Sequence, residues 1–323
     1  IILMDEVISK WGFGSGVSLF ILAGVSKTIL IATLSPFTSS VPSNLWFSAA
    51  AAGQAPAGVF MQLVSGNIQP ANIIGLVSTL AVFLVAVYAQ AMRVEIPLTF
   101  GNVRGFGQKW PLKFVYTNVI PVIFVGALLS NFQLFASLMT KRGIELSVGG
   151  FYIVGKYTGA ASPSADTLIY YFSAPNGLIT NIVNSATTLS LQVPVTQMVQ
   201  MLVYTSFYVV GAAIFSIFWM RTSGQDPRSV AEQIADIGMK VPGHRKDTRV
   251  IEKILQRYIP PLAVLGGAFV GFLAAVANYT NAFGSGTGIL LAVMISYQLY
   301  EELAKKHMEE MHPAFRKFMQ EGV

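Results

Sequence analysis

The amino-acid sequence predicts an all-α integral membrane protein, a polytopic bundle with about six transmembrane helices. Of the 323 residues, 53% are hydrophobic and only 11% are charged, whereas a soluble domain carries about 25% charged residues. The apolar residues gather in stretches of about 20, the length that crosses a bilayer as a helix. The basic residues gather in alternate connecting segments between these stretches. Lipid is therefore the expected solvent for most of the chain.

The predicted spans follow one another along the whole chain. Five stretches are mainly apolar, and a sixth has an apolar first half and a polar end; they are residues 17–36, 73–92, 114–139, 195–220, 261–277 and 289–303. Another uncharged stretch, 44–64, contains Ala, Gly, Ser and Gln in place of Leu and Ile. Its composition favours an interfacial segment over a further span, although its length would allow crossing.

The distribution of basic residues predicts the orientation of the spans. Lys and Arg concentrate in 93–113, 221–259 and 305–323, which are separated by pairs of spans and so lie on one side. By the positive-inside rule this side is cytoplasmic. The expected organisation is a preceding cytoplasmic loop with the first span (1–36), an external segment (37–72), two spans (73–140), an external ordered cap (141–194), three spans (195–304) and a cytoplasmic tail (305–323). The chain begins with neither an initiator Met nor a signal peptide, so we expect a fragment.

Prolines mark several expected helix ends. Asp226-Pro227 is typical of an N-cap followed by proline in the first turn, and predicts a helix to about Gly238. A second short helix is expected over 249–258, ending at Pro260-Pro261. Pro121 lies inside the predicted third span, which it should bend near residues 122–124.

Polar side chains within the spans are costly and require a partner or water. Asn131 and Gln133 lie in the third span, where they predict either contacts between helices or a polar path. Lys27 is the charge within the first span, and we expect its stem to extend to the outer interface. Asn278-Tyr279-Thr280 matches a glycosylation sequon, but its position between two spans favours a plain turn.

The basic segments exceed what orientation requires. Four Lys and Arg residues lie in 93–113 and eight lie in 221–259. They either set the topology alone or also form a docking surface for a phosphate-rich partner, which would bind with release of counterions. The candidate docking residues are Arg104, Lys109, Arg245, Lys246 and Arg249.

The chain carries few signals of enzymatic chemistry. It has no cysteine and three histidines; His307 and His312 do not have the spacing of a zinc protease helix. No paired carboxylates occur in the first five predicted spans. We therefore predict neither an enzyme nor a metal or cofactor site.

A four-residue motif occurs twice. Phe-Gly-Ser-Gly opens the first span at 13–16 and the sixth at 283–286, and these two spans run in opposite directions. Inverted repeats produce such similarity, but Gly and Ser are also common at the beginnings of membrane helices. Both interpretations remain open.

Several motifs in order along the chain resemble the SecY family in its archaeal form. They are residues 14–20 (GSGVSLF), 92–98 (MRVEIPL), 113–116 (KFVY), 120–123 (IPVI), 259–261 (IPP), 269–273 (FVGFL) and 284–288 (GSGTG). The family has ten spans in two inverted halves, and the resemblance implies that this chain holds the fifth to the tenth. It also implies that 44–64 is external and that the repeated motif pairs the fifth span with the tenth.

The resemblance implies a channel through which unfolded polypeptides cross, or enter, the cytoplasmic membrane without covalent chemistry. A ring of apolar side chains would close the pore, here Val17, Ile21, Ile123 and Leu291. The third and fourth spans, with Asn131 and Gln133, would form one wall of a lateral gate for signal sequences and nascent chains. The basic loops would dock ribosomes, and SecE-type and Sec-beta-type subunits would be permanent partners. A secondary transporter of the inverted-repeat type is the alternative, and an intramembrane enzyme is a weaker one.

Overall fold

The computed structural model describes most of the chain and divides it into two units. The described residues are 5–8, 16–37, 58–66, 70–100, 107–142, 146–148, 151–154, 157–158, 162–163, 167–175, 181, 195–236, 239–240 and 248–311. One compact unit comprises residues 1–67 and 288–323, and the other comprises 68–287. The smaller unit is thus assembled from both ends of the chain.

The smaller unit contains α2 (Gly16–Leu34), α4 (Val59–Ser65) and most of α12 (Gly286–Met311). The backbone N–H of Gly58, just before α4, donates to the Ser35 carbonyl just after α2, at 3.1 Å. In the described part of the 44–64 stretch, the helix is only seven residues long, too short to cross a bilayer. This supports the interfacial prediction for that part.

The larger unit is built on four long helices, α5 (Pro70–Ala91), α6 (Ile120–Lys141), α9 (Val195–Thr222) and α11 (Thr248–Tyr279). Together with α2 they are five helices long and apolar enough to cross a membrane. The sixth predicted span is helical as α12, but the polar second half keeps it outside this group of described helices. The predicted fold class, a polytopic helical membrane protein, is confirmed.

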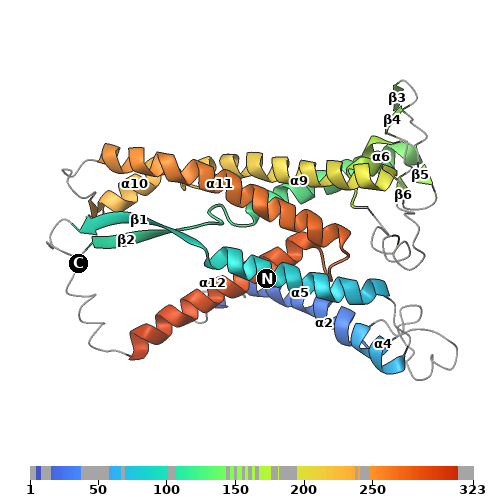
Figure 1. Ribbon diagram of the computed structural model, residues 1–323, viewed down its shortest axis with the longest axis horizontal. Coiled ribbons are helices and arrows are strands. Elements are labelled where there is room, and N and C mark those ends of the chain that lie inside the picture. The colour runs from blue at the N-terminus through green and yellow to red at the C-terminus, as the bar shows by residue number, and fades with distance from the viewer. Residues whose placement is uncertain are drawn as a thin grey trace. The chain divides into compact units, whose positions relative to one another are not determined.

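The helices α9 and α11 lie against each other because small residues face the contact (Figure 1). A Cβ atom on Gly271 would lie 2.7 Å from the Tyr208 carbonyl oxygen, and one on Gly267 would lie 2.7 Å from Cβ of Ser216. The two glycines are four residues apart, the small-xxx-small spacing that lets membrane helices approach closely. A buried polar chain joins the same contact, since Ser216 Oγ donates to the Ala263 carbonyl at 2.5 Å and the Thr117 hydroxyl lies 2.7 Å from Ser216 Oγ.

Two predictions about proline were wrong. Pro121 occupies the first turn of α6, which begins at Ile120, so its missing N–H deletes no intrahelical bond and the expected cause of a bend is absent. α11 continues through Pro260 and Pro261 instead of ending there. The carbonyls of Gln256 and Arg257 lose their donors, but both residues are exposed, while Ile259 is fully buried. Packing therefore outweighs the local preference of proline.

The basic segments contain strands that the sequence analysis did not predict. β1 (Arg93–Phe100) and β2 (Gly107–Lys113) form an antiparallel hairpin, and β7 (Met239–Lys240) pairs with β1 to complete a sheet in the order β2-β1-β7. The helix predicted after Asp226 is confirmed as α10 (Pro227–Asp236).

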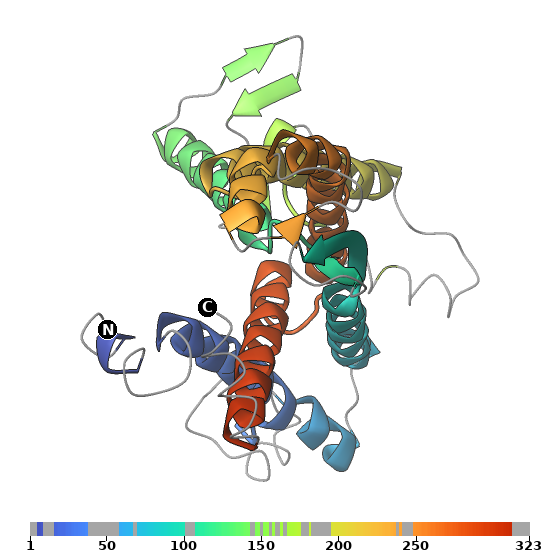
Figure 2. The same cartoon turned by 90° about the vertical axis from the view of Figure 1, so that its left-hand side faces the viewer.

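The described part of 141–194 also contains short elements. β3 (Leu146–Val148) pairs with β4 (Phe151–Val154), β5 (Tyr157–Thr158) pairs with β6 (Ser162–Pro163), and α7 (Leu168–Tyr171) follows. Figure 2 shows the β3–β4 hairpin extending beyond the helices of its unit.

The α9–α11 contact should be sensitive to one methyl group. In Gly271→Ala, the new Cβ meets backbone and Cβ atoms of α9, and relieving this overlap should cost about 1–3 kcal/mol. Gly24→Ala is the matched control, since a Cβ there has nothing within 4 Å. We expect a lower thermal unfolding midpoint in detergent for Gly271→Ala only. Equal midpoints for the two variants would contradict the packing argument.

Candidate functional site

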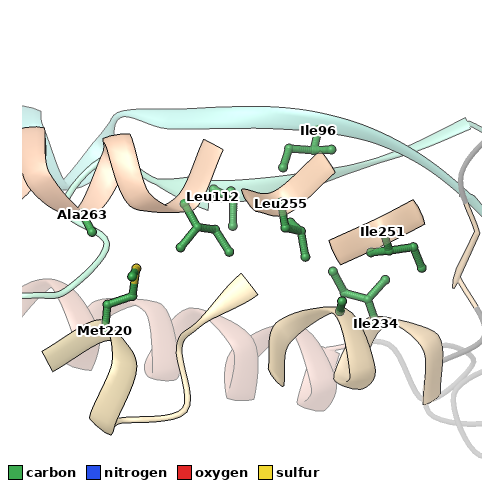
Figure 3. Close-up of a cluster of buried hydrophobic side chains, with 9 residues drawn as sticks. Ile96, Leu112, Met220, Ile234, Ile251, Leu255 and Ala263 are labelled. Atoms are coloured by element: carbon green, nitrogen blue, oxygen red, sulfur yellow. The ribbon is translucent and has the colours of Figure 1, made fainter. Parts of the chain in front are cut away.

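A small hydrophobic core joins the two basic segments into what we call the platform, made of β1, β2, α10 and the first half of α11. Its buried side chains come from all of these elements and from the end of α9 (Figure 3). They are Ile96, Leu112, Met220, Ala231, Ile234, Ile251, Leu255, Ile259 and Ala263. In β1, Ile96 is buried while the preceding Glu95 is exposed, as expected for successive side chains on opposite faces of a strand. The platform therefore has its own core, which reaches the adjoining ends of two spans at Met220 and Ala263.

The sheet brings the two basic segments together. Thr99 in the first segment pairs with Lys240 in the second, and Phe100 pairs with Met239. The candidate residues Arg104, Arg245 and Lys246 lie outside the described residues, in the two segments that continue from this pairing. The flanks of both predicted docking loops are thus neighbours, which their separation in sequence did not reveal.

The other two candidate docking residues lie on described elements. Lys109 is in β2 and pairs with Pro97 of β1. Arg249 is exposed in the first turn of α11. Both belong to the platform, so the structure brings them into the same assembly as the loop flanks.

Hydrogen bonds fix the beginning of α10 and its contact with the hairpin. Asp226 Oδ2 accepts from the Ser229 N–H at 3.4 Å, and hydrogen bonds from the Ser229 side chain and nearby backbone lower the pKa of Asp226. The Tyr116 hydroxyl donates to the Gln225 carbonyl at 2.9 Å. Burial, and then the charge of Asp226, raise the pKa of Tyr116 to about 12, so this hydroxyl stays protonated and can donate at physiological pH.

The predicted pore residues lie near the beginnings of three helices. Val17 and Ile21 share one face of α2, and 43% and 38% of their surfaces are exposed. Ile123 is in the first turn of α6 and Leu291 is in the second turn of α12; both are half-buried. Because Ile123 belongs to the larger unit and the others to the smaller one, the ring of four remains a prediction.

The two predicted gate residues have different surroundings. Asn131 is exposed on α6, while Gln133 Nε2 donates to the Phe172 carbonyl at 3.4 Å. Sequence analysis did not select Gln200 of α9, which is buried and donates to the Tyr170 and Ser173 carbonyls. The available signal was a polar side chain within the mainly apolar predicted span 195–220. Both glutamines hold the segment that follows α7.

The described residues contain no group of three or more His, Asp and Glu side chains that could hold a metal ion. The arrangement offers instead a folded basic platform, apolar helix faces and close helix contacts.

Comparisons with known proteins agree in one family. The SecY family model matches residues 1–300. The protein translocase subunit SecY of Methanocaldococcus jannaschii is 39% identical over 319 residues, which are 99% of this chain and 64% of that protein. The same subunit of Archaeoglobus fulgidus is also 39% identical, covering 99% of this chain and 66% of that protein.

Solved structures are similar as well. A protein-conducting channel has a TM-score of 0.70 and 38% identity, covering 96% of this chain and 63% of that chain. Sec61 in a canine ribosome-channel complex has a TM-score of 0.66 and 38% identity, with 96% and 63% covered. The chain therefore spans less than two thirds of the first of these relatives. From the family match and these identities together, the chain belongs to the SecY family.

Proposed function

We propose that this chain forms the channel part of a subunit that moves unfolded polypeptides across the cytoplasmic membrane and releases membrane segments into it. The observation that carries the proposal is 39% identity to a named protein translocase subunit over 99% of the chain. Helices long and apolar enough to cross a membrane support it. The chain would act as a multi-pass membrane protein without performing covalent chemistry.

The proposed orientation places the platform and the tail 305–323 in the cytoplasm. The excess of Lys and Arg in 93–113 and 221–259 supports this orientation. The segments 37–72 and 141–194 would then be external. Asn131 and Gln133 would face a lateral gate, and signal sequences and nascent chains would be the passing ligands.

Partners are proposed on two grounds. The relative in the canine complex is bound to a ribosome, and the platform here joins two basic segments that could contact ribosomal RNA and proteins. SecE-type and Sec-beta-type subunits are proposed from the family resemblance. Exposed apolar faces, such as Val77, Leu80 and Leu84 of α5, would be covered by lipid or by such subunits.

The secondary transporter is the weaker alternative. Transporters built from inverted repeats hold substrates at broken helices near the midplane. In contrast, α9 and α11 are continuous for 28 and 32 residues, and the relatives above are named as translocase subunits. Both points favour the channel.

Docking through the basic loops should depend steeply on salt. Arg104→Glu and Arg245→Glu should weaken ribosome binding, because each phosphate contact contributes about −0.7 to −0.9 to the slope of log affinity against log salt. Lys141→Glu is the matched control, an exposed basic residue at the end of α6 next to the segment proposed to be external. Co-sedimentation over a salt series measures the slopes. Unchanged binding by both Arg variants would rule out this docking surface.

The pore seal should fail when its apolar side chains become polar. Changing Ile21, Ile123 and Leu291 together to Ser in the full-length protein should make resting channels conduct ions. Apolar side chains keep water out of a narrow constriction, whereas hydroxyl groups allow water and ions to enter. Protein export should continue. The readout is ion flux across reconstituted vesicles, normalised to the folded protein present.

A control variant separates sealing from packing. Val77, Leu80 and Leu84 are more exposed than the ring residues, and changing them to Ser introduces the same number of hydroxyls. This variant should remain tight. If well-folded Ile21, Ile123 and Leu291 variants also remain tight, the proposed ring, and with it the proposed pore, is wrong.

A further inference from the structure

The repeated Phe-Gly-Ser-Gly motif ends at the beginning of a helix in both copies. In the second copy, Gly286 is the first residue of α12, and its backbone N–H donates to Asn278 Oδ1 at 2.8 Å. Asn278 lies in the last turn of α11. The side chain that caps α12 therefore comes from the preceding helix, eight residues upstream.

The first copy has the same kind of cap. Gly16 is the first residue of α2, and the N–H of Val17 donates to Asp5 Oδ1 at 3.0 Å. Asp5 belongs to the helical residues 5–8, while Phe13, Gly14 and Ser15 lie outside the described residues. Again a side-chain oxygen from the preceding helical segment reaches a first-turn N–H, a group that has no partner within its own helix.

Both caps depend on the glycine that ends the motif. A Cβ on Gly16 would lie 2.9 Å from Asp5 Cα, and a Cβ on Gly286 would lie 2.3 Å from the Ala274 carbonyl oxygen. Each distance is too short for any side chain, so the backbone of the preceding helix touches the beginning of the next. We call this arrangement a corner. The glycine lets the backbones of two successive helices approach closely, and a side-chain oxygen from the first helix caps the beginning of the second.

Hydrogen bonds from α5 also hold the second corner, at the residues between α11 and α12. Thr79 Oγ1 accepts from the Phe283 N–H at 2.8 Å, and the Ser78 and Thr280 hydroxyls share a hydrogen bond. Asn278 Nδ2 donates to the Tyr204 hydroxyl at 2.9 Å. The Asn278 amide is therefore engaged on both of its atoms. Asn278 and Tyr279 lie in the last turn of α11 and only Thr280 lies in a turn, so the plain turn predicted for the sequon was wrong for its first two residues.

We infer that Asp5 and Asn278 are positioning residues that fix where α2 and α12 begin, and thereby the height of the pore residues Ile21 and Leu291. Each of these two side chains lies five residues after its corner glycine, about 7.5 Å along the helix axis. If a corner loosens, the first turn frays, and the apolar side chain in the second turn shifts along the helix axis. The inference rests on the proposed channel function.

Amide exchange tests the caps without reference to transport. In the unmodified protein, the amides of Val17 and Gly286 should exchange more slowly than other first-turn amides. Asp5→Ala and Asn278→Ala should speed exchange at Val17 and Gly286 respectively by about fivefold, the population change expected from losing one N-cap. Asp5→Asn and Asn278→Asp keep an acceptor oxygen and should retain protection. Rapid exchange of both amides in the unmodified protein would overturn the inference whether or not the variants fold.

Ion flux through resting channels then tests positioning. Asp5→Ala and Asn278→Ala should raise flux per folded protein in the full-length protein, and Asp5→Asn and Asn278→Asp should restore tight membranes. Thr33→Ala is the matched control, because it removes a hydroxyl bonded to the Ile29 carbonyl in α2 without touching the first turn. It should not leak.

The outcomes separate this inference from the channel proposal. If the Ser variant of Ile21, Ile123 and Leu291 leaks but Asp5→Ala and Asn278→Ala stay tight, positioning is wrong and the channel stands. If that Ser variant stays tight while amide exchange behaves as expected, the caps exist but the channel proposal fails. Equal leakage from Thr33→Ala and the two Ala cap variants would also overturn positioning.

Discussion

The close approach of α9 and α11 is the constraint on which most of the larger unit depends. Water does not drive apolar helices together inside a bilayer, so the contact must come from close packing and hydrogen bonds. Gly267 and Gly271 supply the first, and the chain from Thr117 through Ser216 to the Ala263 carbonyl supplies the second. Thr117 lies in the connection between β2 and α6, so this one contact also fixes the hairpin and the beginning of α6.

The helices that enter the membrane could be predicted from sequence because their signal is local. A stretch of about twenty apolar residues that crosses lipid must form its backbone hydrogen bonds within itself, and a helix does this. Asp226-Pro227 likewise predicted α10, because capping and proline both act within one turn. The family resemblance rested on short motifs spread along the chain, and the comparisons confirm it.

The platform could not be predicted in the same way. Pro97 and Pro111 lie within β1 and β2, and proline within a strand argues against assigning one. The hairpin forms nevertheless because Ile96 and Leu112 are buried against α11, a contact between distant segments. The same contact explains why α11 continues through Pro260 and Pro261. The caps from Asp5 and Asn278 were hidden for a similar reason, since the residues that each cap joins lie 12 and 8 positions apart in sequence.

The division of the chain into units also orders its biosynthesis. The larger unit is contiguous in sequence, whereas the smaller one needs both the first 67 residues and those after 287. Domains generally fold as units while the chain emerges from the N-terminus. Along this part of the chain, the residues of α2 are therefore made before the whole larger unit, and most of the residues of α12 are made after it.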